Sequence, residues 1–264
     1  MFKVAKFFIK LLFFTSLKKN NEGYFIKKVI EMGNYYLGKN KNYDRFDLEV
    51  KHIKTFFKEK TLDICIDVGG HRGSYSKELL KQFNINNLII FEPSIQNFNY
   101  LEVLFKDENI KVEPLAVSNE LGNQMFYYNN KKSSLSSLYS RSIFIDNEDI
   151  ISYEVEVTSL YEYISRNFPN KVIDFIKIDT EGNEYKVIKG LGSKIKMVKV
   201  IQFEFGSTTV DTLISFFEFW KLLKKNNFKL FRMGPNNLFQ IHSYSNEDEH
   251  IEYSNFIAVN EKYI

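Results

Sequence analysis

Short apolar runs alternate with longer amphipathic stretches from about residue 60 to the end of the chain. A short unbroken apolar run is typical of a strand that is buried on both faces, whereas apolar residues spaced three or four apart indicate a helix. The predicted strands are residues 61–69, 88–93, 110–118, 172–182, 198–206, 228–234 and 255–260. The predicted helices are residues 74–83, 95–106, a segment that starts after Thr158, 183–189 and 211–227.

This order of elements predicts an α/β fold with a mostly parallel sheet, because β-α-β units join parallel strands through right-handed crossovers. The last two strands, 228–234 and 255–260, are expected to pair antiparallel at one edge of the sheet. Residues 124–129 and 153–157 alternate in polarity and are expected to form a peripheral hairpin. Thr158 or Ser159 could cap the helix that follows.

The first 60 residues are expected to form a helical extension before a single domain at 61–264. Within it, residues 1–19 carry lysines at helical spacing, which interrupt the apolar stretch before it reaches the about 20 residues that span a bilayer. No small-residue cleavage site of a signal peptide follows. We favour a helix that docks on the domain or on a second subunit. Peripheral contact with an anionic inner membrane leaflet is the alternative.

Composition narrows the class of protein. The chain has 264 residues, 44% of them hydrophobic, which is enough for a buried core. The net charge of +3 is small and the basic residues are scattered, so we expect no nucleic-acid partner. The single cysteine, Cys65, cannot form an internal disulfide, and its apolar surroundings predict a buried thiol. A cytoplasmic protein is expected, at the inner membrane surface if residues 1–19 bind there.

A glycine-rich turn begins at Asp67 with the sequence DVGGHRGS, between a predicted buried strand and a helix. Gly69, Gly70 and Gly73 permit a tight turn and let backbone N–H groups approach a ligand. The spacing is not G-x-G-x-x-G, because Val68 holds the position of its first glycine. A carboxylate at position 67 suits a ligand with an ammonium group, such as S-adenosylmethionine, better than a pyrophosphate.

The second motif is FEP, in which Glu92 ends the next strand and Pro93 follows it. Ligands of open α/β sheets bind beyond the carboxyl ends of the strands, near the switch point of the strand order. A carboxylate there can accept hydrogen bonds from both hydroxyl groups of a ribose. This motif therefore indicates a nucleoside without identifying which one. In the third motif, LAVSNELG, the small residues Ala116 and Val117 suit an adenine face, and Ser118 or a backbone amide could contact its edge.

Carboxylates gather where two further strands end. Asp179, Glu181 and Glu184 follow the strand at 172–182, and Glu204 lies near the end of the strand at 198–206. So many carboxylates near one point are costly unless they are solvated, paired or used in chemistry.

These motifs together resemble the FkbM family of methyltransferases. The residues that carry the resemblance are DVGGHRGSYS, FEPS, PLAVSNELG, SSL, VTSLYEYI, DFIKIDTEGNEYKVIKG and FEFG, in this order from about residue 60 onward. One departure is His71, where the family usually has Asn. The first 60 residues lie outside the resemblance.

The resemblance implies a Rossmann-like class I methyltransferase fold, S-adenosylmethionine as methyl donor and O-methylation of a small molecule or glycan, often a sugar hydroxyl in surface-polysaccharide pathways. By position, Asp67, Gly69 and Gly73 would line the methionine end of the donor, and Glu92 would hold its ribose. Residues that would border the adenine are Ser94, Ala116, Val117 and Ser118. The expected cofactor-binding set also includes Gly70, Ser76 and Pro93.

Methyl transfer to a sugar hydroxyl benefits from a general base, and we expect Asp179, Glu181 or Glu204 in that role. His242, in the loop before the last strand, is a further candidate base. The same three carboxylates could instead bind Mg²⁺, which would hold and acidify the hydroxyl. The polar loop at 129–152 suits a polar acceptor. The sequence is compatible with an oligomer.

The sequence also bears on two alternative functions. A nicotinamide-dependent oxidoreductase could share the fold class, but it predicts the intact dinucleotide motif that this sequence lacks. A non-catalytic glycan-assembly protein would have lost the motif residues Asp67, Gly69, Gly73 and Glu92, all of which are present.

Overall fold

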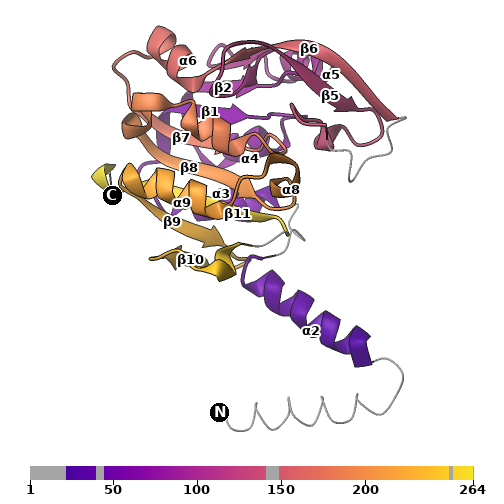
Figure 1. Ribbon diagram of the computed structural model, residues 1–264. Helices are drawn as coiled ribbons and strands as arrows, with labels where there is room; N and C mark the ends of the chain where they lie inside the picture. Colours follow the sequence, from indigo (N-terminus) through magenta and orange to yellow (C-terminus); the bar gives the residue numbers. More distant parts are fainter. Residues whose placement is uncertain (1–21, 40–44, 141–148, 250–251, 264) are drawn as a thin grey trace.

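A central sheet of eight strands organises the part of the chain that this computed structural model describes, residues 22–39, 45–140, 149–249 and 252–263 (Figure 1). Its strands are β1 (Thr61–Val68), β2 (Asn84–Phe91), β3 (Ile110–Glu113), β7 (Ile173–Ile178), β8 (Val198–Phe205), β9 (Phe228–Met233), β10 (Leu238–Ile241) and β11 (Ser254–Asn260). The strand order is β10-β9-β11-β8-β7-β1-β2-β3.

Five of these strands run parallel, as the alternation of strands and helices predicted. β3, β2, β1, β7 and β8 pair parallel with their neighbours, whereas β11 lies antiparallel between β8 and β9. The antiparallel pairing of β9 and β11 is confirmed, but their position at the edge is not. The short strand β10, which sequence reasoning missed, pairs with β9 and forms the edge.

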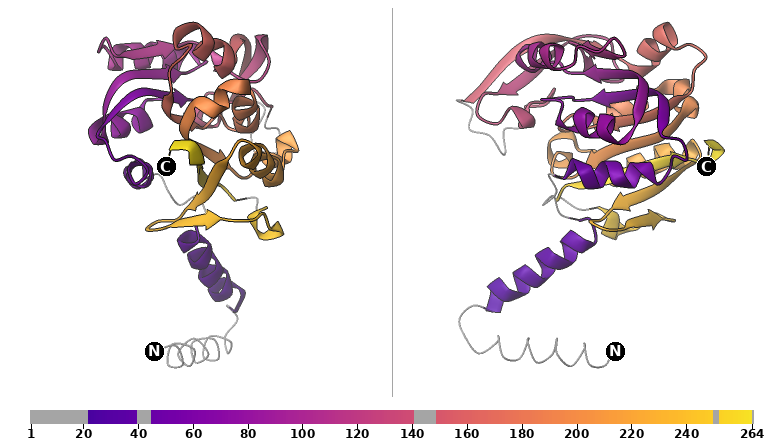
Figure 2. Two further views of the ribbon diagram at one scale, coloured as in Figure 1. Left: turned by 90° about the vertical axis from the view of Figure 1, so that its left-hand side faces the viewer. Right: turned by 180° about the vertical axis from the view of Figure 1, so that it is seen from behind.

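Helices cover both faces of the sheet, giving three layers (Figures 1 and 2). The helices on one face are α3 (Phe46–Lys54), α4 (Ser74–Gln82) and α5 (Ile95–Leu104), and those on the other are α6 (Leu160–Asn167), α7 (Glu184–Lys189) and α9 (Phe216–Lys225). Adjacent residues of β1 show why both faces are apolar. Cys65 packs with the first set of helices and Ile66 with the second, and both are fully buried, as expected for a central parallel strand.

Two predicted elements are interrupted. The run 110–118 divides at Pro114 into β3 and β4 (Ala116–Val117), because proline has no N–H to donate to a strand ladder. The run 211–227 divides at Leu213, whose φ of 57° breaks the helix between α8 (Thr209–Thr212) and α9.

A second, three-stranded sheet covers one end of the central sheet. β5 (Gly122–Asn129) and β6 (Ile150–Thr158) form the predicted antiparallel hairpin, and β4 pairs with β6. Ser159 caps α6 by accepting a hydrogen bond from the amide of Glu162, so the sequence indicated the cap correctly. Residues 141–148 of the intervening loop lie outside the described part.

The N-terminal region contributes two helices, α2 (Glu22–Tyr36) and α3. Residues 1–19, for which a docked or membrane-bound helix was expected, lie outside the described residues. Val50 and Ile53 of α3 are fully buried in the core, so the packed domain begins before residue 61. In contrast, α2 projects away from the sheet (Figure 2). Within the described ranges, no helix has both the length and the apolar character to cross a membrane.

Candidate functional site

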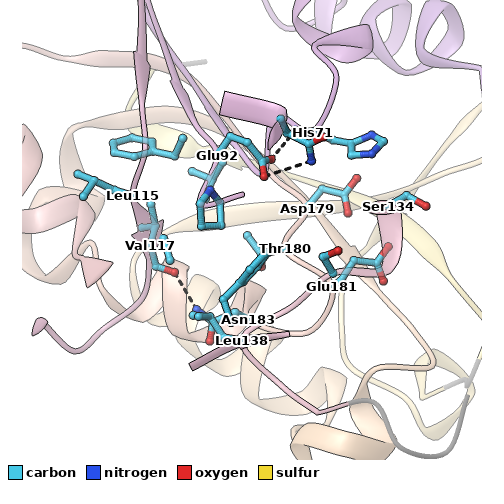
Figure 3. A pocket seen from close by; sticks show the side chains of 18 of the residues that line it. His71, Glu92, Leu115, Val117, Ser134, Leu138, Asp179, Thr180, Glu181 and Asn183 are labelled. Atoms are coloured by element: carbon cyan, nitrogen blue, oxygen red, sulfur yellow. Dashed lines mark hydrogen bonds between the residues drawn. The ribbon is translucent and has the colours of Figure 1, made fainter. Parts of the chain in front are cut away.

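Two hollows meet at the carboxyl ends of the parallel strands. The first, which we name the Glu92 pocket, is lined by residues at or just after the ends of β1, β2, β4 and β7. The second, the Glu204 cleft, is larger and more open. Five residues line both: Gly69, His71, Ser134, Asp179 and Glu181. Figure 3 shows how the side chains of the Glu92 pocket converge.

The glycine-rich turn brings β1 against its neighbours. The amides of Gly69 and Gly70 both donate to the carbonyl of Phe91 at 3.0 Å. Gly69 has a φ of 87°, and a Cβ there would lie 1.9 Å from the carbonyl oxygen of Asp179. Only glycine therefore lets this turn pass so close to the loop after β7. Gly70 lines the Glu204 cleft, whereas Gly73 packs on Leu101 before α4.

Glu92 is fixed at the end of β2 by backbone and side-chain donors. One carboxylate oxygen accepts the amide of His71 at 2.7 Å, and the other accepts the amide of Ser94 at 3.0 Å and the Asn97 side chain at 3.4 Å. The side chain is only 5% exposed, and this burial raises the pKa of Glu92 to about 7. The oxygen that accepts from His71 keeps a lone pair for a ligand hydroxyl, and on the other oxygen a second hydroxyl would replace the long Asn97 contact.

His71 links the glycine-rich turn to the short 3₁₀ helix η1 (Ser133–Leu135). Its Nε2 lies 2.9 Å from the hydroxyl of Ser133, and burial lowers the pKa of the imidazole. The φ of His71 is 47°, a left-handed conformation in which Asn and His are both enriched. The departure from Asn at this position is therefore compatible with the turn.

Part of the lining of the Glu92 pocket is apolar. The apolar lining residues include Phe91, Pro93, Leu115, Ala116 and Val117, and Figure 3 shows Leu115 and Val117 among them. Asn183 adds one polar group, because its side-chain amide donates to the carbonyl of Val117 at 2.7 Å and also lines the pocket. Sequence reasoning missed Asn183. A flat apolar wall with one amide suits a heteroaromatic ring.

Two residues expected at the adenine do not line either hollow. The amide of Ser118 donates to the carbonyl of Thr158, and its hydroxyl is buried. Ser94 lies at the N-cap of α5, where its hydroxyl accepts from the amide of Asn97. Ser94 therefore contributes by holding Glu92 through its own amide.

Three carboxylates come together at the boundary of the two hollows. One oxygen of each of Asp179, Glu181 and Glu204 lies within 4.8 Å of the others. The amide of Asp179 donates to the carbonyl of Val68 at 3.0 Å, which places the residue directly after β7. Tyr253 approaches the Glu181 carboxylate, at 3.5 Å between its hydroxyl and one oxygen. The structure thus brings together the three carboxylates that the sequence singled out, and they come from two different strands.

Glu184, the fourth carboxylate of this region, has a structural role instead. It accepts hydrogen bonds from the amides of Thr180 and Gly182, at 2.7 and 3.0 Å, and from the Thr180 hydroxyl at 3.0 Å. Burial raises the pKa of Glu184. The carboxylate holds the loop in which Glu181 adopts a φ of 55°.

Lys177 is the main charged residue that sequence reasoning missed. Its ammonium group is 3.3 Å from a carboxylate oxygen of Asp179 and 3.6 Å from one of Asp67. Burial alone would lower the pKa of Lys177, but the charges of Asp179 and Asp67 outweigh it and raise the pKa. A lysine between Ile176 and Ile178 in an otherwise apolar strand was the available signal.

Three expected site residues are placed away from the hollows. Asp67 is 1% exposed and accepts a hydrogen bond from the hydroxyl of Ser76 at 2.6 Å, so both residues lie beneath the glycine-rich turn. His242 is exposed after β10, whose last residue pairs with Leu230 near the start of β9. That end of the sheet is opposite the carboxyl ends of β1 and β7, and the structure does not bring His242 to the carboxylates.

Comparison with known proteins identifies the family. The family described as "Methyltransferase FkbM domain" matches residues 67–230, more than half of the chain. The chain belongs to the FkbM methyltransferase family. The match includes the turn after β1, Glu92 and the three carboxylates. A comparison with curated proteins found no match.

Solved structures of similar fold include other methyltransferases. An FkbM methyltransferase from Methylobacillus flagellatus KT has 13% identity and a TM-score of 0.46, covering 76% of this chain and 44% of that one. A precorrin-6y C5,15-methyltransferase from Geobacter metallireducens GS-15 has 11% identity and a TM-score of 0.44, covering 84% and 92%. An S-adenosylmethionine-dependent O-methyltransferase from Thermotoga maritima has 12% identity and a TM-score of 0.40, covering 80% and 64%.

The chain has the class I methyltransferase fold expected of this family, a mostly parallel sheet with an antiparallel C-terminal strand. It spans less than half the length of the Methylobacillus protein. Membership of the family implies S-adenosylmethionine as methyl donor. The side chains of the Glu92 pocket fit an adenosyl group, because they combine a buried carboxylate that has a free lone pair with apolar residues and the Asn183 amide.

Proposed function

We propose that this FkbM methyltransferase transfers a methyl group from S-adenosylmethionine to an oxygen of a sugar hydroxyl. The observation that carries the proposal is the junction of the two hollows at Asp179 and Glu181. The Glu92 pocket adjoins the Glu204 cleft there, and carboxylates stand at the boundary. Holding a methyl donor and an acceptor side by side in adjoining sites supplies much of the rate enhancement of a displacement reaction.

On the donor side, the chain's residues bind and orient. Glu92 would accept hydrogen bonds from the two ribose hydroxyls, while Ala116 and Val117 would contact the adenine ring. The backbone of Gly69 and Gly70 would border the methionine end. S-adenosylmethionine supplies a methyl group activated by attachment to a positively charged sulfur.

On the acceptor side, the lining of the Glu204 cleft suits a sugar. Tyr75 and Tyr253 supply aromatic rings, and Arg72 and Lys132 supply donors. Glu204 is 7% exposed on β8 and can accept hydrogen bonds from hydroxyl groups. Sugars present both hydroxyl groups and apolar C–H faces, so a cleft with both kinds of side chain matches them.

Asp179 is the proposed general base, with Glu181 and Glu204 as neighbours that hold the acceptor. As the acceptor oxygen bonds to the methyl carbon, the bond from that carbon to sulfur breaks and the hydroxyl proton passes to the carboxylate. Asp179 suits this role because its side chain is about one-third exposed, whereas Glu181 and Glu204 are more deeply buried.

A second possibility for the same three carboxylates is a Mg²⁺ site. Their oxygens lie within 4.8 Å of one another, and carboxylates are ligands that Mg²⁺ prefers. Treatment with EDTA separates the two mechanisms. Turnover that is unchanged after chelation would leave the carboxylate as base, whereas loss of turnover that added Mg²⁺ restores would assign the metal.

The proposed function is tested in two steps. Thermal-shift measurements with S-adenosylhomocysteine and with NAD should show stabilisation by the first only, since a bound ligand stabilises the folded state. Stabilisation by NAD alone would favour an oxidoreductase. If neither ligand stabilised the protein, a non-catalytic function would be favoured. Transfer of a labelled methyl group to nucleotide sugars and polysaccharide fragments should then give an alkali-stable methyl ether. A methylated amine or carbon would contradict O-methylation.

A further inference from the structure

The helix α2 presents an apolar side that no described part of the chain covers. Ile26, Ile30, Met32 and Tyr36 are between 37% and 58% exposed. At 3.6 residues per turn these positions share one side of the helix. Lys27, Lys28 and Glu31 occupy the other side. An amphipathic helix of a soluble domain normally turns such a side toward its own core, and α2 does not.

The direction of α2 is set by tight contacts at its C-terminal end. Arg232 donates to the carbonyl of Leu37 at 2.9 Å, and the hydroxyl of Ser254 donates to the carbonyl of Gly38. A Cβ at Gly38, whose φ is 69°, would lie 1.8 Å from a backbone oxygen of Met233. The helix therefore leaves a packed junction and points away from the sheet, as both views in Figure 2 show.

This junction lies close to the acceptor side of the site. Gly38 and Glu204 line the same small cavity, together with Met233 and Ser254. The chain therefore enters the domain beside Glu204, while the apolar side of α2 lies further from the sheet (Figure 2).

Charge is distributed unevenly between the N-terminal region and the rest of the chain. Residues 1–39 contain eight lysines and two glutamates, a net charge of +6, and no arginine or aspartate. The whole chain carries +3, so residues 40–264 carry −3. α2 itself is neutral, with Lys27 and Lys28 balanced by Glu22 and Glu31, so the positive charge lies in residues 1–21 and at Lys39, which flank α2 in the sequence.

We propose that α2 lies on an anionic membrane surface, with its apolar side at the boundary between headgroups and acyl chains and its lysines among the headgroups. Amphipathic helices with aromatic residues bind in this way, and anionic lipids add an attraction for each lysine of the flanking segments. A second copy of the chain fits the same face less well, because pairing would bring together two regions of charge +6.

The test uses the full chain and lipid vesicles. The protein should sediment with vesicles of phosphatidylcholine and phosphatidylglycerol in equal parts, but not with phosphatidylcholine alone, and high salt should release it. The double variant Ile26→Ser with Ile30→Ser should lower the bound-to-free ratio about tenfold, because it removes apolar side chains that the membrane would bury. Val103→Ser with Leu121→Ser, at exposed apolar positions of the domain, is the matched control.

Several outcomes would overturn the proposal. These are failure to bind anionic vesicles, equal binding to neutral vesicles, or equal loss of binding in the control variant. Sedimentation velocity tests the two other possible partners of the apolar side of α2, a second copy of the chain and residues 1–21. A dimer that the Ile26→Ser and Ile30→Ser changes dissociate would assign the face to a second copy. A monomer that these changes destabilise would assign it to residues 1–21. Binding of S-adenosylhomocysteine is measured separately, so failure of the membrane proposal can be distinguished from failure of the proposed methyl transfer.

Discussion

Lys177 of β7 is paired in the sheet register with Asp67 of β1, and their charged groups lie 3.6 Å apart. The same ammonium group reaches Asp179, the proposed base, at 3.3 Å. One buried cation thus joins the strand that carries the glycine-rich turn to the strand that carries the carboxylates. This explains how a lysine is tolerated in the middle of an apolar strand.

Replacing Lys177 by Met should lower the free energy of unfolding by about 3–5 kcal/mol, because Asp67 would remain buried without its counter-charge. Chemical denaturation measures this difference. Lys171→Met is the control: its ion pair with Asp63 has a similar distance, 3.4 Å, but the two side chains are 64% and 45% exposed, and we expect a loss below about 1 kcal/mol. Adding Asp67→Asn to Lys177→Met should recover part of the loss. Equal effects of the two lysine variants would refute the buried-pair interpretation.

Donor binding should depend on pH through Glu92. Its pKa of about 7 means that the carboxylate is ionised above neutrality and protonated below it. Only the ionised form offers both oxygens as acceptors to the ribose, so affinity should be greatest above pH 7 and fall at lower pH by up to about tenfold per pH unit. Calorimetric titration with S-adenosylhomocysteine measures it. The variant Glu92→Gln should bind more weakly throughout and lose this dependence. A pH profile common to both proteins would mean that another group titrates.

Asp179→Asn should mainly lower turnover. Loss of a general base reduces kcat by about 10²–10⁴-fold, while affinity for S-adenosylhomocysteine should change far less. Kinetics and calorimetry on the same preparation separate the two effects, and the melting temperature checks the fold. Asp107→Asn, at an exposed position, serves as control. Unchanged kcat in Asp179→Asn, with a large loss in Glu181→Gln, would transfer the role to Glu181.

Glu184→Gln should destabilise the loop that carries Asp179 and Glu181. The substitution weakens charge-assisted hydrogen bonds to the amides of Thr180 and Gly182, and we expect a loss of about 1–3 kcal/mol. Thermal unfolding measures the loss, and turnover should fall with it because the loop positions the base. The exposed Glu102→Gln is the comparison variant. If Glu184→Gln melted at the same temperature as Glu102→Gln, the loop would not depend on this carboxylate.

The order and type of most elements followed from local patterns. Apolar runs and helical periodicity are properties of adjacent residues, so the central strands and the helices around them could be predicted. The two interrupted elements and the missed strand β10 also have local causes. Pro114 and Leu213 interrupt longer runs, and β10 has only four residues, too few to show a pattern.

The candidate site was predictable where it depends on strand ends. The carboxyl ends of parallel strands lie at one edge of a sheet, so Glu92, Asp179 and Glu204 could be expected to converge. The roles of Asp67 and Ser76 could not be assigned in this way. Whether a polar residue at the end of a strand faces a ligand or a buried partner depends on what packs against it.

The sequence by itself determined the fold class, the family and the carboxylates at the strand ends, because each is encoded in short motifs and their order. Only the tertiary structure decided that Lys177 pairs with Asp67, that Glu184 binds backbone amides and that His242 lies at the opposite end of the sheet. These outcomes depend on contacts between residues distant in the chain, and no local pattern specifies which of several carboxylates becomes buried against a given cation.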